Sequence, residues 1–535
     1  MSGSTADRIG GQVLLLALLA AIVYLELAYS GAMQAGVTAN PDEAAHYVTS
    51  LMIQAYLSDG LTTSPRQFAE SYYLHYPKVA FGVWPPLVHA ALGAWMLVAS
   101  ATPASALIFL GLTLVVLAYV LFRTAAPHVE TAFAAAAAVW FVLLPTVQRT
   151  AGSILLDIPC ALLMVCATIA FGRYLDSHRW QDACLFGFLA SAALLTKNNA
   201  AAIALIPPIA VAMSRKWFLF KRWSFWAPVA IVSAICVPWY LFTWNLVEYA
   251  AGLAGDTLSA PRQNFVLLAK EPGVLFVPFA LIGIGKTVGR GATNGVWNCL
   301  FALLLSVWLF HSIAYPTVAP RYLLAAYAAS ILFCIAGVDW LVARTIAFKT
   351  HARAILAVAL TATFLVSGFP WQKKLRRGFV AAADVMLADG LQKNATALVC
   401  SDSIGEGSFV AAVATTEQHP RTIVLRASKL LAESGWNGAN YAPKHDDSHS
   451  LSEALLRARV EYVAVDAVED SPHHRMLMRA LRESADWLLV RAVDPGVPAP
   501  EHSTVELYRR MTDLPPGPPD FEINLRNSLG KTLQP

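Results

Sequence analysis

Residues 11–47 read GQVLLLALLAAIVYLELAYSGAMQAGVTANPDEAAHY, an apolar run that ends near Ser30 and is followed by two adjacent carboxylates, Asp42 and Glu43. The run is long enough to cross the hydrocarbon core of a bilayer, which takes about 20 residues of helix. It has no convincing cleavage site before further apolar stretches follow, so we interpret it as a retained first span and not as a signal peptide. The acidic pair is then expected at the membrane surface.

The composition of the whole chain is that of a membrane protein. Of its 535 residues, 57% are hydrophobic and 14% are charged, whereas soluble domains carry about 25% charged residues. The apolar excess lies in residues 11–370, and charged and turn-forming residues return at ordinary frequency from Trp371 onward. We therefore predict a transmembrane module over residues 1–370, with a large outer loop over 34–103, and a water-soluble domain over 371–535.

Charge and cysteine usage exclude other classes of function. The formal net charge is only +4, and the basic residues form short clusters between apolar stretches. A nucleic-acid partner is therefore not expected, because such proteins present one continuous basic face. The seven cysteines form neither a disulfide framework nor a zinc spacing.

The apolar stretches predict about eleven transmembrane helices. They lie near residues 11–33, 104–123, 131–148, 156–173, 183–198, 200–213, 224–243, 272–285, 295–313, 321–341 and 353–370. The stretch Trp84–Ser100 is a further candidate, but it is short and is opened by Pro85-Pro86. We place it at the interface, because lysine and arginine then concentrate in one alternate set of loops. Under the positive-inside rule, that set is cytoplasmic, and the outer loop, the loop near Asp157 and the C-terminal domain lie on the outer side.

The soluble part alternates strand-like and helix-like runs. They are Ala395–Ser401, Ser408–Glu417, Thr422–Leu425, Leu451–Arg459, Tyr462–Asp466, His473–Ala485, Trp487–Ala492 and Thr504–Arg509. This order predicts a small α/β domain. The tail after Thr512 is expected to be extended or poorly ordered, because it is rich in proline and asparagine.

The carboxylates on the outer side have two interpretations each. Asp42 and Glu43 precede an apparently helical run from Tyr47 to Leu57, so they stabilise a helix N-terminus, or one of them is a general base or a metal ligand. Asp157 stands at the outer end of an apolar span, where an ionised side chain is costly and usually functional. Its alternative is a helix cap before Pro159.

Three cations and two histidines accompany these acids. Lys197 and Arg321 begin or end apolar segments on the outer side, where they either extend to the headgroups or hold a phosphate leaving group. Arg149, beside the Asp157 loop, is a further candidate for a phosphate contact. His46 and His75 flank the acidic motif; they are ordinary loop residues, substrate contacts, or two ligands of a zinc ion that lacks a fixed third ligand.

Five short motifs occur in order between residues 10 and 345. They are Pro41-Asp42-Glu43-x-x-His46-Tyr47; Tyr76-Pro77-Lys78 with Trp84-Pro85-Pro86-Leu87; Leu156-Asp157-Ile158-Pro159; Leu195-Thr196-Lys197; and Pro320-Arg321-Tyr322-Leu323-Leu324. In this order they resemble bacterial relatives of dolichyl-phosphate-mannose protein mannosyltransferases and aminoarabinose lipid A transferases. The resemblance implies a polytopic α-helical membrane fold of the GT-C type, in the bacterial cytoplasmic (inner) membrane. In that family, the segment that matches Trp84–Ser100 lies along the outer interface.

The resemblance also implies a mechanism. A sugar moves from a polyprenyl-phosphate donor to a lipid, glycan or protein acceptor, with inversion at the anomeric carbon. Asp42 is then the base that activates the acceptor, Glu43 supports it, and Asp157 orients the acceptor or binds a divalent ion. The other residues predicted to bind the donor phosphate or the substrate are Arg321, Lys197, Lys78 and Arg149, and His46, Tyr47, His75 and Tyr322.

Three alternatives stay open at this point. Asp42 and Asp157 hold a Mg²⁺ or Mn²⁺ ion, or the phosphate leaving group makes a metal unnecessary. The protein is a secondary transporter, since scattered intramembrane charges also suit translocation, although the sequence has no repeated halves. Finally, it is a glycan polymerase or ligase with a lipid-diphosphate donor.

Overall fold

A computed structural model describes residues 5–80, 82–244, 258–289, 295–345, 355–362, 372–389, 395–417, 419–433, 441–466, 471–496, 504–525 and 531–535. The chain divides into two compact units. The first, here called the helical unit, comprises Met1–Tyr29, Val83–Val88 and Ile108–Gln372. The second, here called the sheet unit, comprises Ser30–Gly82, His89–Leu107 and Lys373–Pro535.

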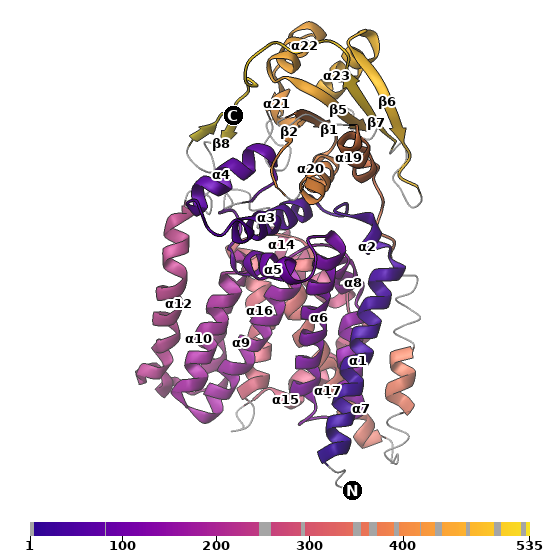
Figure 1. Cartoon of the computed structure of the whole chain (residues 1–535). Helices are drawn as coiled ribbons and strands as arrows, with labels where there is room; N and C mark the ends of the chain where they lie inside the picture. The colour runs from indigo at the N-terminus through magenta and orange to yellow at the C-terminus, as the bar shows by residue number, and fades with distance from the viewer. Residues whose placement is uncertain are drawn as a thin grey trace. The chain divides into compact units, whose positions relative to one another are not determined.

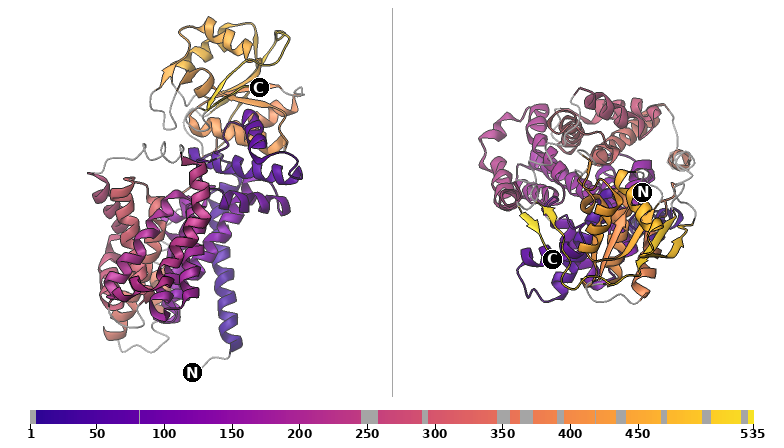
Figure 2. Two further views of the ribbon diagram at one scale, coloured as in Figure 1. Left: turned by 90° about the vertical axis from the view of Figure 1, so that its left-hand side faces the viewer. Right: turned by 90° about the horizontal axis from the view of Figure 1, so that it is seen from above.

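Six helical segments in the described residues are long and apolar enough to cross a membrane, by length and composition. They are Ile9–Tyr29 in α1 (Thr5–Tyr29), α6 (Pro103–Ala125), α9 (Asp157–Ser177), α12 (Trp223–Phe242), Gly295–Ala314, which joins α16 (Gly295–Leu309) to η4 (Phe310–Ala314), and Pro320–Arg344, which joins η5 (Pro320–Leu323) to α17 (Leu324–Thr345). The long helices of the helical unit run side by side (Figure 1 and Figure 2). The protein is a multi-pass membrane protein.

A seventh span is broken. Helix α7 (Thr131–Leu143) and helix α8 (Pro145–Ala151) are together long and apolar enough to cross a membrane, but their axes are bent by 60° relative to each other. The bend falls at Leu144, directly before Pro145. Proline has no N–H to donate and disfavours helical backbone at the residue before it, so the sequence itself places the break here.

The predicted count of eleven spans is not confirmed. The spans predicted at 183–198, 200–213 and 272–285 are shorter helices in the structure. They are α10 (Trp180–Leu194), η1 (Asn198–Leu205) with α11 (Ile206–Ser214), and α15 (Val277–Thr287). Helix α11 has prolines in its first turn, and they end the preceding helical run. Of the span predicted at 353–370, the structure describes only residues 355–362, which are helical.

Small residues let two helices of the helical unit approach closely. A Cβ atom on Gly283 of α15 would overlap the carbonyl oxygen of Phe333, and one on Gly337 of α17 would overlap the carbonyl oxygen of Phe279. Helices in lipid commonly associate through small residues, because lipid tails are as apolar as the helix surface and the hydrophobic effect does not drive the helices together. Any larger residue at Gly283 or Gly337 would force α15 and α17 apart.

The N-terminal part of the sheet unit is built of short helices. They are α2 (Ala32–Ala35), α3 (Pro41–Ser58), α4 (Pro65–His75) and most of α5 (Leu87–Val98). Helix α5 has 12 residues, too few to cross a bilayer, which takes about 20. The stretch Trp84–Ser100 therefore does not add a span.

The C-terminal part of the sheet unit is the predicted α/β domain. Its main sheet has the strand order β2-β1-β5-β7-β6. The strands are β1 (Thr396–Cys400), β2 (Ile423–Arg426), β5 (Val460–Asp466), β6 (Trp487–Val493) and β7 (Val505–Arg510). Strand β1 is parallel to both neighbours, whereas β5 with β7 and β6 with β7 are antiparallel. All five residues of β1 are buried, as expected for a parallel strand covered on both faces.

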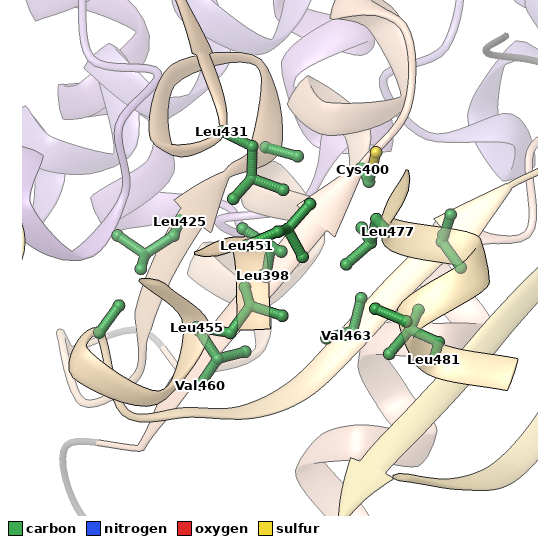
Figure 3. Close-up of a cluster of buried hydrophobic side chains, with 14 of the residues drawn as sticks. Leu398, Cys400, Leu425, Leu431, Leu451, Leu455, Val460, Val463, Leu477 and Leu481 are labelled. Atoms are coloured by element: carbon green, nitrogen blue, oxygen red, sulfur yellow. The ribbon is translucent and has the colours of Figure 1, made fainter. Parts of the chain in front are cut away.

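Helices cover both faces of this sheet (Figure 1). On one face, leucines of α22 (Ser448–Arg457) and α23 (Pro472–Glu483) pack on Leu398, Val463 and their neighbours (Figure 3). Helices α19 (Phe379–Ala388) and α20 (Ser403–Glu417) pack on each other through Phe379 and Phe409. The smaller elements are η2 (Trp217–Lys221), α14 (Ala260–Lys270), η3 (Val274–Phe276), α21 (Ala427–Leu430), β3 (Ala432–Glu433) and β4 (Ala442–Pro443).

The tail after Thr512 contains extended segments, as expected, but two of them also pair with each other, which the sequence did not predict. Strands β8 (Ile523–Leu525) and β9 (Lys531–Leu533) pair in an antiparallel two-stranded sheet. These strands are only three residues long, which is too short for an alternating pattern to stand out in the sequence.

Candidate functional site

The motif that contains Asp42 forms the start of helix α3 in the sheet unit. Asn40 is the N-cap, and its side-chain oxygen accepts a hydrogen bond of 3.0 Å from the Asp42 backbone N–H. Pro41 occupies the first helical position, where its missing N–H costs nothing. Asp42 is half-buried. It lies in the first turn of the helix, where an acidic side chain favours helix formation.

Glu43 is held by two protein groups. One carboxylate oxygen accepts the Ala39 backbone N–H at 2.8 Å, and the other contacts the Lys374 ammonium at 2.5 Å. The Glu43 side chain is 0% exposed and that of Lys374 is 4% exposed. A carboxylate with both oxygens occupied in this way fixes the chain around it. Glu43 therefore differs from its neighbour Asp42 in the structure, although the sequence presents them as equals.

Lys78 is buried among groups of the α/β domain. Its ammonium donates a 3.0 Å hydrogen bond to the Ser403 carbonyl. Burial, together with the nearby Arg426, lowers the pKa of Lys78 to about 7, although Glu406 and Asp42 act in the opposite direction. A lysine with a pKa near 7 is present in both its protonated and its neutral form at physiological pH.

We expect Lys78 to make stability depend on pH. The folded pKa is lowered from 10.5, so the folded state releases this proton first and stability rises as the pH increases from about 7 toward 10.5. The thermal midpoint of the wild type, measured in detergent, should therefore rise relative to that of Lys78→Met across this range. A difference that is flat or falls with pH would show that the ammonium is not buried.

The other predicted residues near α3 are engaged in protein contacts. The Tyr47 hydroxyl donates to the Ala101 carbonyl at 2.8 Å and contacts the Thr415 hydroxyl at 3.0 Å. His46 is buried, and its Nδ1 lies 3.0 Å from Nε2 of the equally buried His89.

His75 makes a separate contact from the pair formed by His46 and His89. Its Nδ1 lies 2.9 Å from the Ser71 carbonyl, one turn earlier in α4. Within the part of the chain that the structure describes, no group of three or more His, Cys, Asp or Glu side chains is arranged to hold a metal ion.

In the helical unit, Asp157 and Lys197 form a buried ion pair. Asp157 is the first residue of α9, and Lys197 directly precedes η1. The Lys197 ammonium donates to Oδ1 of Asp157 at 2.6 Å, and the two side chains are 8% and 0% exposed. Oδ2 of Asp157 is buried without a hydrogen-bond partner among the described residues. A buried, unsatisfied carboxylate oxygen is rare in folded proteins and is typical of a functional position.

Tyr322 joins this pair to Arg321. The Lys197 ammonium lies 4.7 Å from the centre of the Tyr322 ring, and the Arg321 guanidinium lies 5.2 Å from it. The ring also stacks on His311 at 5.3 Å. Both cations therefore face the same electron-rich ring, and the structure brings together Asp157, Lys197, Arg321 and Tyr322 within one unit.

Arg149 lies on the exposed side of the bent helix α8. Its guanidinium donates to the Thr146 hydroxyl at 2.9 Å, and the Thr146 backbone N–H contacts Glu271. Asp42, Glu43 and Lys78 belong to the sheet unit, whereas Arg149 and the Asp157 cluster belong to the helical unit.

Three residues in these contacts were not found from the sequence. They are Lys374, His89 and His311. Lys374 lies in the basic run Lys373–Arg377, which resembles a solvated flank of the membrane module. His311 lies inside an apolar span, and the rule that intramembrane ionisable residues are usually functional would have identified it. His89 carries no such signal, because α5 is an ordinary apolar helix.

Comparison with known proteins gives no match by sequence and a clear match by structure. No protein-family model matches the chain, and no curated protein matches it significantly. The structure of ArnT from Cupriavidus metallidurans in the apo state has a TM-score of 0.59 at 15% identity, covering 94% of this chain and 98% of that chain. The same protein bound to undecaprenyl phosphate has a TM-score of 0.56 at 13% identity, covering 95% and 99%. ArnT is an aminoarabinose lipid A transferase, and the chain therefore has the GT-C fold of that glycosyltransferase over nearly its whole length.

Proposed function

We propose that this chain is a membrane glycosyltransferase that moves a sugar from a polyprenyl-phosphate donor to an acceptor on the outer face of the bacterial cytoplasmic membrane. The observation that carries the proposal is the buried Asp157–Lys197 pair, with Arg321 and Tyr322 beside it, inside a GT-C fold. The two cations beside the Tyr322 ring can bind a phosphate oxygen through their positive charge. The free Asp157 carboxylate oxygen can accept a hydrogen bond from a hydroxyl of the substrate. The ArnT structure with undecaprenyl phosphate supports this donor class.

The reaction is a direct displacement. The acceptor oxygen or nitrogen forms a bond to the anomeric carbon, and the bond between this carbon and the phosphate oxygen breaks with its electron pair on the phosphate. Asp42 takes the acceptor proton as general base. The configuration at the anomeric carbon inverts, because the reaction is a single displacement.

Each predicted residue keeps a role in this proposal. Glu43, held by Lys374, fixes the start of α3 and thereby the position of Asp42. Asp157 orients the acceptor, or binds Mg²⁺ or Mn²⁺. The residues proposed to contact the donor phosphate or the substrate are Lys197, Arg321, Lys78 and Arg149, and His46, Tyr47, His75 and Tyr322.

The test is a transfer assay with the full chain in membranes. Membranes from producing and non-producing cells are incubated with a panel of radiolabelled polyprenyl-phosphate sugars and one lipid-diphosphate sugar, and the label is followed into lipid, glycan and protein fractions. We expect transfer from one polyprenyl-phosphate sugar only in producing membranes. Transfer from the lipid-diphosphate sugar alone would show that the donor is a lipid diphosphate and not a polyprenyl phosphate. Uptake of free sugar without transfer would indicate a transporter.

Arg321→Ala should weaken donor binding. Losing a hydrogen bond between charged groups costs about 1.5–3 kcal/mol, so we expect the dissociation constant for undecaprenyl phosphate to rise roughly 10- to 100-fold. The matched control is Arg344→Ala, at the other end of the apolar segment Pro320–Arg344, which should leave this constant unchanged. Equal binding by the wild type and Arg321→Ala in detergent would remove Arg321 from the phosphate site.

A further inference from the structure

A cavity of about 590 Å³ lies in the helical unit, and none of its lining residues belongs to the Asp157 cluster. It is formed where two loops meet: the turn between α9 and α10, and the turn between η2 and α12. The side chains that give it its chemical character are His178, Arg179, Trp180, Lys221, Arg222 and Trp223. Positive charge and tryptophan therefore gather at one hollow in the protein surface.

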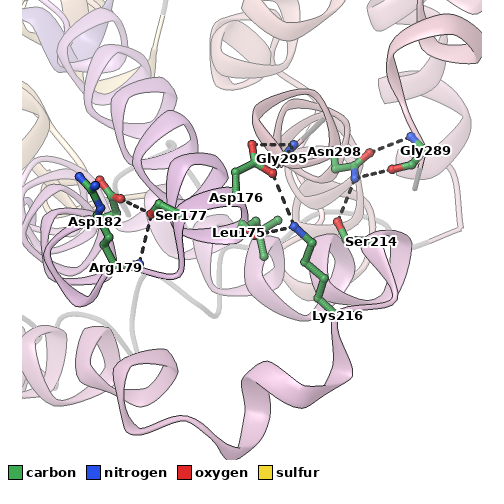
Figure 4. Close-up of polar contacts among 10 residues, drawn as sticks. All are labelled: Leu175, Asp176, Ser177, Arg179, Asp182, Ser214, Lys216, Gly289, Gly295 and Asn298. Atoms are coloured by element: carbon green, nitrogen blue, oxygen red, sulfur yellow. Dashed lines mark hydrogen bonds and ion pairs between the residues drawn. The ribbon is translucent and has the colours of Figure 1, made fainter. Parts of the chain in front are cut away.

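The cations of this cavity outnumber the carboxylates beside it among the described residues. Arg179, Lys221 and Arg222 form no ion pair with any described residue. The nearby carboxylates are occupied elsewhere (Figure 4): Asp176 binds Lys216 and the Gly295 N–H, and Asp182 accepts the Ser177 hydroxyl. Asp182 keeps its negative charge when it accepts a neutral hydroxyl, so the three cations and this carboxylate leave the cavity with a net positive charge.

Two helix N-termini add to this charge. Helices α10 and α12 both begin at the cavity, with Arg179 and Arg222 as their N-cap residues. Neither N-cap provides a side-chain hydrogen bond, and backbone N–H groups in a first helical turn have no intrahelical acceptor. Arginine is an unfavourable N-cap, because it meets the positive end of the dipole. In α10, Asp182 in the first turn already offsets part of this repulsion, whereas α12 has no acidic residue there. An anion bound between the two helices would offset the rest.

His178 contributes a neutral group to the same wall. Its Nε2 is buried without a hydrogen-bond partner among the described residues. Burial lowers the pKa of His178, as do Lys216 and Arg222. The imidazole is therefore neutral at pH 7 and can donate one hydrogen bond to a bound oxygen.

Exposed aromatic residues indicate where the anion comes from. Trp180 is 51% exposed, Trp223 is 69% exposed, and their ring centres lie 6.5 Å apart. Trp217 and Trp226, which flank the second loop, are also exposed. Only 17% of the span in α12 is buried inside the protein. Exposed tryptophans at the end of such a helix mark the level of the lipid headgroups.

We propose that this cavity binds the phosphate of an anionic phospholipid headgroup, in the leaflet that the positive-inside rule assigns to the cytoplasm. Basic pockets between transmembrane helices on that side are suited to such headgroups. The two helix N-termini and three cations contact the phosphate, and Trp180 and Trp223 lie along the glycerol and upper acyl region. The site is separate from the sugar-transfer proposal and does not depend on it.

The test compares lipid binding by full-length variants. Delipidated protein is titrated with short-chain phosphatidylglycerol or phosphatidylcholine, and bound lipid is counted by native mass spectrometry. We expect the wild type to prefer phosphatidylglycerol. The double variant Lys221→Gln/Arg222→Gln should bind it roughly 30-fold more weakly, because each cation near a membrane surface contributes about a fivefold gain in affinity.

The matched control is Lys286→Gln/Arg344→Gln, which removes the same charges from α15 and α17, where both cations lie over Trp340. It should keep wild-type affinity. Equal losses in the two double variants would mean general attraction to the charged protein, and would overturn the site. A third titration uses inorganic phosphate: if it binds as tightly as phosphatidylglycerol and is lost with Lys221 and Arg222, the ligand is a soluble phosphate and the lipid assignment is wrong.

Discussion

Asp42→Asn is expected to abolish sugar transfer while leaving folding and donor binding close to those of the wild type. General bases contribute about 10²- to 10⁴-fold to a rate, and asparagine cannot take the acceptor proton. The substitution keeps the shape of the side chain, and the hydrogen bond that holds this position uses the Asp42 backbone N–H, not its carboxylate. The measurement is transfer from the identified polyprenyl-phosphate sugar by purified enzyme, together with the dissociation constant for undecaprenyl phosphate.

Asp59→Asn is the matched control for this loss. Asp59 is the C-cap of the same helix α3, so the same change is made at the opposite end of one element. It should leave transfer at the wild-type rate. Transfer by Asp42→Asn at the wild-type rate would discard Asp42 as the base, and the same loss in both variants would indicate that α3 had unfolded.

The family resemblance already assigns the role of base to Asp42, and the structure adds a physical reason to prefer it over Glu43. Both acids lie in the first turn of α3, and a helix cap explains either of them equally well. The structure separates them, because Glu43 is fully buried and bound by Ala39 and Lys374, whereas Asp42 is half-buried. The partner Lys374 comes from more than three hundred residues away in the chain, and no local pattern predicts such a contact.

The α/β domain was predictable nearly strand by strand. The run predicted at 462–466 is β5 (Val460–Asp466), and the run predicted at 487–492 is β6 (Trp487–Val493). Both are apolar, are rich in β-branched or aromatic residues and end at turn residues, so local signals agree with the fold. The pairing of β5 with β7, beyond the intervening β6, depends on packing across the sheet and has no sequence signal.

The membrane part was predictable in kind but not in number. Hydropathy finds apolar helices, and it cannot tell a crossing helix from a shorter one that is buried within the protein. The region 183–213 shows this, because it contains α10, η1 and α11, each shorter than a span, with Lys197 between them. Lys197 is buried there in its ion pair with Asp157, and irregular backbone in a membrane protein is tolerated where it is buried in protein.

Lys197→Met is expected to destabilise the helical unit by about 3–5 kcal/mol, because removal of one partner leaves the buried Asp157 carboxylate without compensation. The matched control is Lys216→Met. Lys216 pairs with Asp176 at 3.5 Å, and those side chains are 20% and 29% exposed, so its loss should cost no more than about 1 kcal/mol. The measurement is thermal or denaturant unfolding of the full chain in detergent.

The double variant Asp157→Asn/Lys197→Met separates structure from function at this pair. With no buried charge left, it should recover most of the stability that Lys197→Met loses. It should not recover donor binding or sugar transfer if Lys197 holds the donor phosphate. Recovery of transfer along with stability would show that the pair only supports the fold. Equal stability of Lys197→Met and the wild type would mean that the contact between Lys197 and Asp157 does not stabilise the fold.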